Sequence, residues 1–179
     1  MNNLKIAFYS PHLGERGTET AMYDFAHYNE TILGNKSIII YNPHCPSNND
    51  TAINKFESRF EVHKLNINND PGWNGGIISP LLDEIVQKQK CDVLYMQKVG
   101  RNDGVFSSVC KNIILACGVN CEPHGDAYIY VSKWLSETAS NAKVPYIPII
   151  IDLPKNQGDL REELGIPKDG IVFGRTGGL

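Results

Sequence analysis

A glycine-containing turn near the amino terminus is the first segment whose residues could do chemistry. It reads Pro11-His12-Leu13-Gly14-Glu15-Arg16-Gly17-Thr18-Glu19 and joins an apolar run to a helical pattern that begins at Thr18. Glycine lets a ligand approach the backbone closely, and the N–H groups at a helix start attract an anion or hydrogen-bond a hydroxyl. The turn is therefore predicted to bind a substrate phosphate or sugar, although a purely structural turn would use the same glycines. The candidate substrate- or donor-binding residues are Gly14, Arg16, Gly17 and Thr18.

The same turn lacks the two common phosphate-binding motifs. A dinucleotide-binding turn reads G-x-G-x-x-G, and His12 stands where its first glycine belongs. The acidic residue that would bind a ribose after the second strand is also absent, because Asn42 follows Tyr41 there. No G-K-[ST] follows the turn, which excludes a P-loop. A dinucleotide-dependent oxidoreductase is therefore a weak interpretation of this chain.

Zinc and hydrolase chemistry have little support elsewhere in the sequence. Only Cys117 and Cys121, with three residues between them, have the spacing of a zinc knuckle, and the nearby Cys110 and His124 do not extend it. Ser132 belongs to no G-x-S-x-G nucleophile motif and is expected to cap a helix. We expect no metal site.

Short apolar runs alternate with helical patterns along the chain, which is typical of βαβ units and a parallel sheet. Several of the runs are apolar without alternation, as expected of strands covered on both faces. The fold class predicted is α/β, a Rossmann-like three-layer α/β/α arrangement with a mostly parallel sheet. The predicted strands are residues 5–9, 37–41, 61–65, 92–97, 112–116, 127–131 and 146–151.

Three helices are predicted between these strands. The surest one starts at Ser79-Pro80, because serine is a good N-cap and proline is favoured at the first helical position. Another begins at Thr18 and carries Met22 on its apolar face, and a third follows Ser132. The segments 42–50 and 66–76 are rich in Asn, Pro and Gly and are expected to be loops.

The alternation of apolar runs and helical patterns is interrupted after Ile151, which suggests a domain boundary. Residues 152–158 have the composition of a linker, 159–165 read as a short helix that ends at a glycine, and 171–174 as one further strand. We expect residues 1–151 to form an amino-terminal domain. Residues 152–179 would then be the linker and the first helix and strand of a second domain.

Composition indicates a soluble globular protein. Apolar residues make up 41% and charged residues 21% of the 179 residues, with a formal net charge of -3 and no basic cluster, so a nucleic-acid partner is not expected. We see no secretory signal and no apolar run long enough to span a bilayer. The odd number of cysteines, five, favours reduced thiols and a cytoplasmic location.

Several segments together resemble the nucleotide-sugar-dependent retaining glycosyltransferases of the GT-B fold (family 4-like), specifically their amino-terminal domain. The turn Gly14-x-x-Gly17-Thr18-Glu19 is similar to a Gly-Gly-x-Glu-like turn of that family. The segments 127–132 and 147–152 resemble its late strand ending in Val-Ser and its interdomain segment Ile-Pro-Asn-Gly-Ile-Asp. Residues 160–167 and 172–175 resemble the helix and the strand that open its second domain.

The resemblance implies a glycosyltransferase whose donor is a nucleotide-diphosphate sugar and whose acceptor is a glycan or another molecule. It implies no further cofactor. The present domain would hold mainly the acceptor, and contact with a membrane surface is compatible with it. Arg175 stands where the family has a diphosphate-binding arginine, and His124 is the candidate for the histidine that many relatives place near the transferred sugar. The alternative is a free-standing Rossmann-like domain that binds a sugar or a protein without catalysis.

Overall fold

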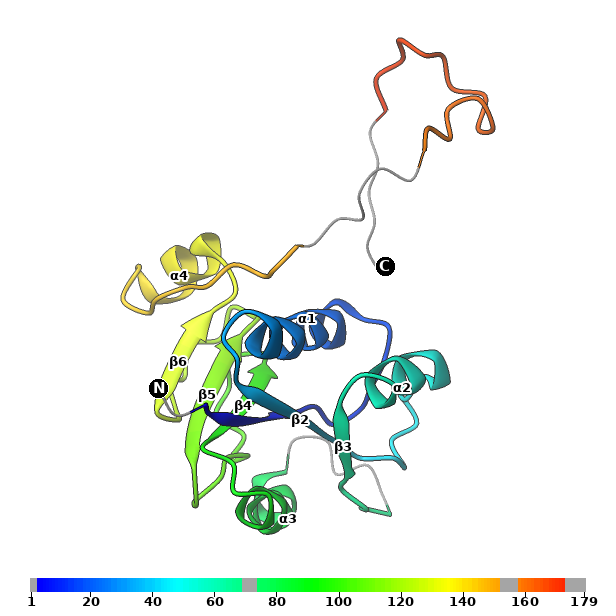
Figure 1. Cartoon of the computed structure of the whole chain (residues 1–179). Coiled ribbons are helices and arrows are strands. Elements are labelled where there is room, and N and C mark those ends of the chain that lie inside the picture. Colours follow the sequence, from blue (N-terminus) through cyan, green and yellow to red (C-terminus); the bar gives the residue numbers. More distant parts are fainter. Residues whose placement is uncertain (1–2, 69–73, 152–157, 173–179) are drawn as a thin grey trace.

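The computed structural model describes residues 3–68, 74–151 and 158–172 and shows six parallel strands that alternate with helices (Figure 1). The predicted Rossmann-like α/β fold is confirmed. The strand order across the sheet is β3-β2-β1-β4-β5-β6, so the order reverses between β1 and β4. The elements are β1 (Lys5–Tyr9), α1 (Gly17–Thr31), β2 (Lys36–Tyr41), α2 (Asp50–Glu57), β3 (Glu61–Lys64), α3 (Gly75–Lys88), β4 (Val93–Lys98), β5 (Lys111–Ala116), β6 (Ala127–Tyr130) and α4 (Lys133–Ser140).

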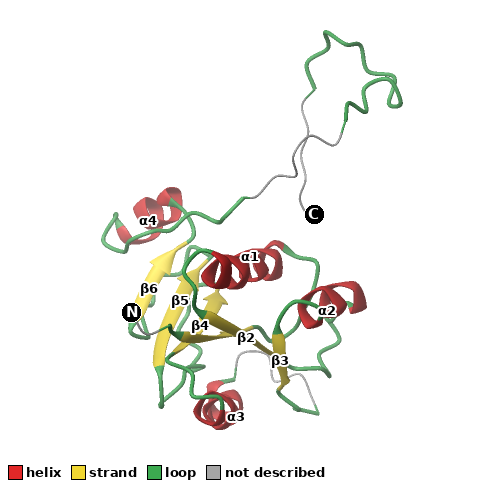
Figure 2. Ribbon diagram, viewed as in Figure 1, coloured by secondary structure: helices red, strands yellow, loops and turns green. Residues whose placement is uncertain are grey.

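Helices cover both faces of the sheet, as Figure 2 shows, with α1 and α2 on one face and α3 on the other. Successive strand residues point to opposite faces, so each strand supplies both layers of the core. Tyr9 and Met96 pack with Leu82 of α3, whereas Phe8 and Tyr95 pack with Met22 of α1. The near-continuous apolar strands of the sequence are explained by this double coverage.

Two predicted elements differ from the structure. Residues 146–151 form no strand, because Tyr146 makes a single bridge with Tyr130 and the chain beyond it, which contains Pro148, is largely exposed. Helix α3 begins at Gly75 rather than at Ser79, because the Asn74 side chain accepts from the Gly76 amide and caps the helix one turn earlier. Asn74 and the Ser79-Pro80 pair are both good helix starts, and the sequence pattern alone does not rank the asparagine first.

Caps set the ends of two shorter helices. Ser132 accepts from the Leu135 amide and starts α4, which confirms the predicted N-cap. Helix α2 was not predicted, and it starts where the Asn49 side chain accepts from the Ala52 amide. The loop predicted at 42–50 is present up to Asn49, which caps the helix that follows.

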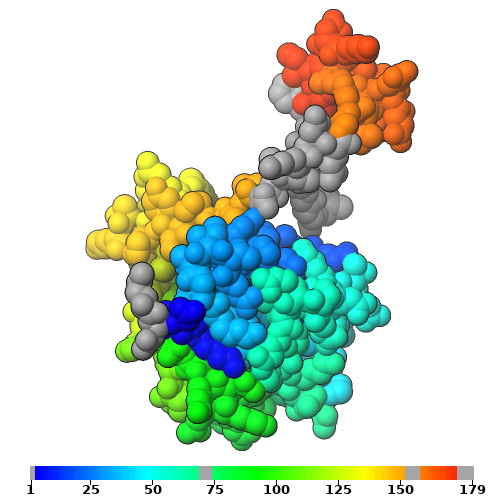
Figure 3. Space-filling model, in the orientation of Figure 1, coloured from blue at the N-terminus to red at the C-terminus, as the bar shows by residue number. Residues whose placement is uncertain are grey.

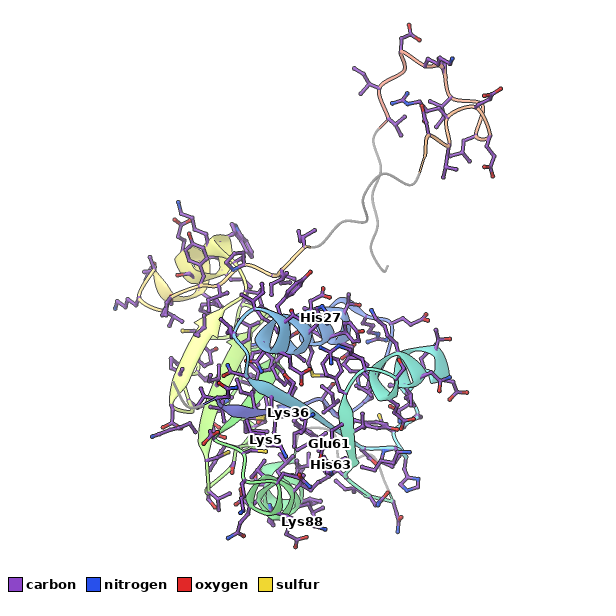
Figure 4. The ribbon with its side chains drawn as sticks, in the orientation of Figure 1. Lys5, His27, Lys36, Glu61, His63 and Lys88 are labelled. Atoms are coloured by element: carbon purple, nitrogen blue, oxygen red, sulfur yellow. The ribbon has the colours of Figure 1, made fainter. Side chains whose placement is uncertain are left out.

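The edge strand β3 carries charged groups. Figure 4 shows Glu61 and His63 on β3 beside Lys36 of β2. His63 Nε2 lies 2.9 Å from Glu61 Oε1, and this hydrogen bond is the main cause that holds the pKa of Glu61 below its usual value. Lys36 Nζ lies 3.9 Å from the other carboxylate oxygen. Charges on an edge strand oppose its pairing with a second sheet.

Residues 158–172 are separate from the sheet and its helices in Figure 3, where they are orange to red. Leu160 and Leu164 are exposed, as are Ile171 and Val172. The helix predicted at 159–165 is not formed, and residues 161–165 are a run of turns that ends at Gly165. Most of the predicted linker, and half of the strand predicted at 171–174, lie outside the described residues. In the described part of the chain, no helix is long and apolar enough to cross a membrane.

Candidate functional site

A polar cavity of about 280 Å³ lies at the carboxyl edge of the sheet, between the ends of β1 and β4. Ligands of open α/β sheets bind outside the carboxyl ends of the strands where the strand order reverses, and this is that point. The cavity is therefore the candidate site. It is lined by Tyr9, Ser10, Pro11, His12, Arg16, Thr18, Glu19, Met22, Gln97, Lys98, Val99 and Cys117.

The turn after β1 is held in place by the loop after β2. The Ser10 amide continues the parallel pairing by donating to the Ile40 carbonyl. Leu13 then donates its amide to Asn48 Oδ1 at 2.9 Å, and its carbonyl accepts from the Asn49 amide at 2.9 Å. Through these bonds the asparagine-rich loop fixes the path by which the chain enters α1.

Glu19, in the first turn of α1, is the most unusual group of the cavity because it is a carboxylate with only 4% of its surface exposed. Its Oε1 accepts from Thr18 Oγ1 at 2.9 Å and from Ser10 Oγ at 3.4 Å, and His12 Nε2 lies 3.7 Å away. Its Oε2 has no hydrogen-bond partner among the described residues. A buried carboxylate is costly unless its oxygens are hydrogen-bonded, although the positive end of a helix reduces that cost.

Lys98, the last residue of β4, also lines the cavity and supplies the opposite charge. Its Nζ lies 2.6 Å from Asp103 Oδ1 and donates to the Val105 carbonyl at 2.6 Å, and only 1% of the side chain is exposed. Burial lowers the pKa of Lys98 from its usual value, and the hydrogen bond to Asp103 opposes that change. The lysine thereby fastens the loop after β4 to the end of the sheet.

His124 is joined to Lys98 rather than to the cavity. Its Nδ1 lies 2.7 Å from the Glu122 carbonyl, which can only accept, so Nδ1 carries the hydrogen. Nε2 then accepts from Lys98 Nζ at 3.4 Å. The imidazole also lies against Tyr128, with the ring centroids 5.6 Å apart. His124 does not line the cavity. In this arrangement it positions the lysine and links the loops that follow β4 and β5.

The structure brings only part of the predicted set together. Arg16 and Thr18 line the cavity, with Arg16 exposed. Gly14 is buried beside Glu19, and a Cβ built on it would lie 3.8 Å from Glu19 Oε2. Gly17 is exposed with open space around it. Arg175 lies outside the described residues. Ligand contact by these residues stays a prediction.

Sequence reasoning missed Glu19 and Lys98 as site residues. Glu19 precedes Met22 and Ala26 by three and seven positions, so the apolar face of α1 already pointed it toward the core. Lys98 follows a strand of buried residues, at the end where ligands of parallel sheets bind. A charged residue on the apolar face of a helix, or at the carboxyl end of a buried strand, therefore indicates a candidate site residue.

A larger cavity, of about 440 Å³, lies along the face of the sheet beside α1. Its walls are almost entirely apolar, with Phe8, Tyr95 and Leu115 from the strands and Phe25 and Tyr28 from the helix. A cavity without convergent polar groups can bury apolar surface but offers no group for catalysis or for orienting a polar substrate. We therefore place the site at the smaller polar cavity.

Within the described ranges, no group of three or more His, Cys, Asp or Glu side chains is arranged to hold a metal ion. Cys117 Sγ donates to the Lys98 carbonyl at 3.1 Å, and burial raises the pKa of its thiol.

Comparison with solved structures finds proteins of similar fold. The fold is similar to the crystal structure of a glycosyltransferase from Rickettsia africae ESF-5, with a TM-score of 0.57 and 19% sequence identity. The match covers 83% of this chain and 43% of that chain, so the present chain spans less than half the length of that protein. No family model matches the sequence, and no curated protein matches it. At this identity the likeness shows a shared fold.

Proposed function

We propose that this chain is the amino-terminal, substrate-binding part of a glycosyltransferase that moves a sugar from a nucleotide-diphosphate sugar to an acceptor. The proposal rests on the polar cavity, which lies where the strand order of the sheet reverses. The fold that contains this cavity is similar to that of a solved glycosyltransferase. We also propose that it acts in the cytoplasm, since the odd number of cysteines favours reduced thiols.

The chemistry that this site would serve is nucleophilic substitution at a sugar carbon. The acceptor hydroxyl replaces a departing diphosphate through an oxocarbenium-like transition state, so the protein must hold the hydroxyl in line and neutralise the leaving oxygens. The cavity offers Glu19 and Thr18 to orient hydroxyl groups, and the exposed guanidinium of Arg16 at its rim for an anion. Arg175, outside the described residues, is proposed as a second cation for the diphosphate, and a second domain would supply the rest of the donor site.

The direct test is sugar transfer by a protein that contains this chain followed by a donor-binding domain. Gly17→Val is expected to keep the fold, because a Cβ at Gly17 meets nothing within 4 Å, and to reduce transfer at least tenfold by narrowing the approach to the start of α1. Glu57→Gln, on the outer helix α2, serves as a matched variant remote from the cavity. Transfer that is untouched by Gly17→Val would make the turn a structural element only.

Calorimetry on the 179-residue chain separates the two candidate functions. If the donor site lies mainly in another domain, nucleotide sugars should bind this chain weakly or not at all. Micromolar binding of a nucleotide sugar by this chain would place the donor site here and contradict our division of the substrates. Absence of transfer in any longer context, with sugar binding retained, would favour the free-standing binding domain.

A further inference from the structure

The entrances to β4 and β5 each carry a cysteine. Cys91 stands two residues before Val93, where β4 begins, and Cys110 stands one residue before Lys111, where β5 begins. Val93 is paired with Lys111 in the parallel register, and the Lys111 amide donates to the Asp92 carbonyl at 3.1 Å. The pairing therefore continues as far as Asp92, and the two cysteines are diagonal neighbours on adjacent segments of the chain.

This placement brings the two backbones within the range of a disulfide. Paired strands lie about 4.8 Å apart and rise about 3.3 Å per residue, so the Cα atoms of diagonal neighbours are about 6 Å apart. Disulfides join Cα atoms that are usually about 4.4–6.8 Å apart. Both side chains also lie on the α3 side of the sheet, since Cys91 belongs to the apolar cluster there and Cys110 packs against it. A bond between the two sulfur atoms would thus need no large movement of the backbone.

A molecule from solvent can reach this pair of thiols. Cys91 and Cys110 line one polar cavity of about 580 Å³ at the amino edge of the sheet. Ser107, Asn112 and Asp126 are among its other lining residues. Cys110 is half-buried, whereas Cys91 is only 9% exposed. The cavity therefore admits a small polar oxidant to Cys110 and leaves Cys91 the more sheltered of the two.

The two thiols also differ in how readily they ionise. Burial raises the pKa of both, and it raises the pKa of Cys91 to about 11, with the nearby Cys110 as a further cause. A hydrogen bond with Ser107 lowers the pKa of Cys110 and opposes the effect of burial there. Since the thiolate is the nucleophile, Cys110 is the first thiol to react and Cys91 the second.

We propose that Cys91 and Cys110 form a redox modification site, at which a peroxide joins the two sulfur atoms in a reversible disulfide. Disulfides that form in reducing compartments are usually transient and redox-sensing, which is compatible with thiols that are ordinarily reduced. The site lies at the amino edge of the sheet, opposite the edge that carries the polar cavity between β1 and β4. The proposal therefore does not depend on the proposed glycosyltransferase function.

The reaction takes two steps. The Cys110 thiolate attacks a peroxide oxygen and breaks the O–O bond, which leaves Cys110 as a sulfenic acid and releases hydroxide when the oxidant is hydrogen peroxide. The Cys91 thiolate then attacks the Cys110 sulfur, and a second hydroxide leaves as the S–O bond breaks and the S–S bond forms. The two protons that the thiols lose convert both hydroxides to water. The peroxide gains two electrons and each sulfur loses one, and a dithiol reverses the bond by exchange.

The bond would hold the entrances of two neighbouring strands together. It closes residues 91–110 into a loop that contains β4 and the pair of Lys98 and Asp103. A cross-link stabilises a protein mainly by restricting its unfolded chain. For a loop of this length the melting temperature should rise by roughly 5–10 °C on oxidation and return on reduction. An unchanged melting temperature in fully cross-linked protein would overturn this stabilising effect.

The test exposes the unaltered 179-residue chain to excess hydrogen peroxide, removes the peroxide with catalase, blocks the free thiols in urea and digests the protein with trypsin without reduction. Trypsin separates the two cysteines, because Cys91 lies in the peptide 91–98 and Cys110 in the peptide 102–111. Mass spectrometry should find these peptides joined, in protein that stays monomeric, and dithiothreitol should release them. Free thiols at both positions, oxidation of Cys110 to the sulfinic acid without the bond, or preferential pairing of either cysteine with another one would overturn the proposal.

Single variants assign the two roles. Cys91→Ala should abolish the cross-link and leave Cys110 to be oxidised further, to the sulfinic acid, because no second thiol captures the sulfenic acid. Cys110→Ser should leave Cys91 reduced under the same conditions. The matched control is Cys121→Ser, which removes an exposed cysteine and should retain the bond in full. Loss of the bond in folded Cys121→Ser would contradict the assignment, and should Cys91→Ala not fold, the peptides of the unaltered chain decide the matter.

Discussion

Removal of the buried charge of Lys98 should weaken the whole domain through the loop that it fastens. In Lys98→Met the apolar stem and most of the volume remain, but the carboxylate of Asp103 loses its cation at 2.6 Å and the Val105 carbonyl loses its donor. Breaking one side of a buried ion pair costs about 3–5 kcal/mol. Asp103 retains some exposure and also accepts from the Val105 amide, so we expect the lower end of that range, about 3 kcal/mol.

This loss is measurable by urea unfolding followed by circular dichroism. A domain of this size loses about 2 kcal/mol of stability per molar urea, so the midpoint should fall by about 1.5 M. Lys111→Met is the matched control, because its ammonium also lies 2.6 Å from a carboxylate, that of Asp126, but 73% of its side chain is exposed. Its midpoint should barely change, since exposed pairs contribute little. A Lys98→Met midpoint equal to that of Lys111→Met would refute the reasoning.

The pH dependence gives an independent check. Because burial lowers the pKa of Lys98 from 10.5, the unfolded chain binds that proton more tightly than the folded chain does. Unfolding therefore takes up a proton between the folded pKa and 10.5, and the stability of the unaltered protein should rise with pH through that window. Lys98→Met lacks this contribution, so the stability difference between the two proteins should widen as pH approaches 10.5. In a double variant with Asp103→Asn, the total loss should be smaller than the sum of the single losses.

Three further predictions follow from the packing. Gly75→Ala would place a methyl 2.2 Å from the backbone of Gly104, so it should lower the stability by about 1–3 kcal/mol, measured by thermal melting; an unchanged melting temperature would contradict this contact. Alkylation of the native protein at pH 8, followed by mass spectrometry, should modify the exposed Cys121 first and leave Cys91 unmodified. Burial raises the pKa of Cys91 to about 11, so little of its thiol is ionised at that pH. Early labelling of Cys91 would show that the chain before β4 opens. Limited proteolysis should cut first in residues 158–172, whose apolar side chains are exposed, and release a stable core. If these residues resist the protease as well as the strands do, they belong to the first domain.

The elements of this fold were largely predictable because they depend on short-range patterns. Of the seven strands predicted within residues 1–151, six are present, with ends that differ by one residue at most. Apolar runs of four to six residues identify buried parallel strands without knowledge of their partners. Tyr146 shows the limit of this reasoning, since its run is equally apolar, but beyond one bridge to Tyr130 the chain does not pair with the sheet.

The site was predictable only in its location. The sequence by itself determined that a glycine-containing turn would enter a helix at the carboxyl edge of β1, since a strand followed by Gly14, Gly17 and a helical pattern has few other outcomes. It also determined which side of α1 would be buried. It did not determine that Glu19 would be left with one oxygen unpaired, because that depends on which donors other segments bring to it.

Only the tertiary structure decided how Lys98, Asp103 and His124 meet. They are separated by up to 26 positions, and they converge because β4 and β5 are adjacent in the sheet and their following loops leave from the same edge. Helix periodicity and capping act within a few residues, so a sequence displays them directly. Burial of a charge, the pairing that compensates it and the direction in which a hydroxyl hydrogen points arise from contacts between distant segments, and they exist only once the chain is folded.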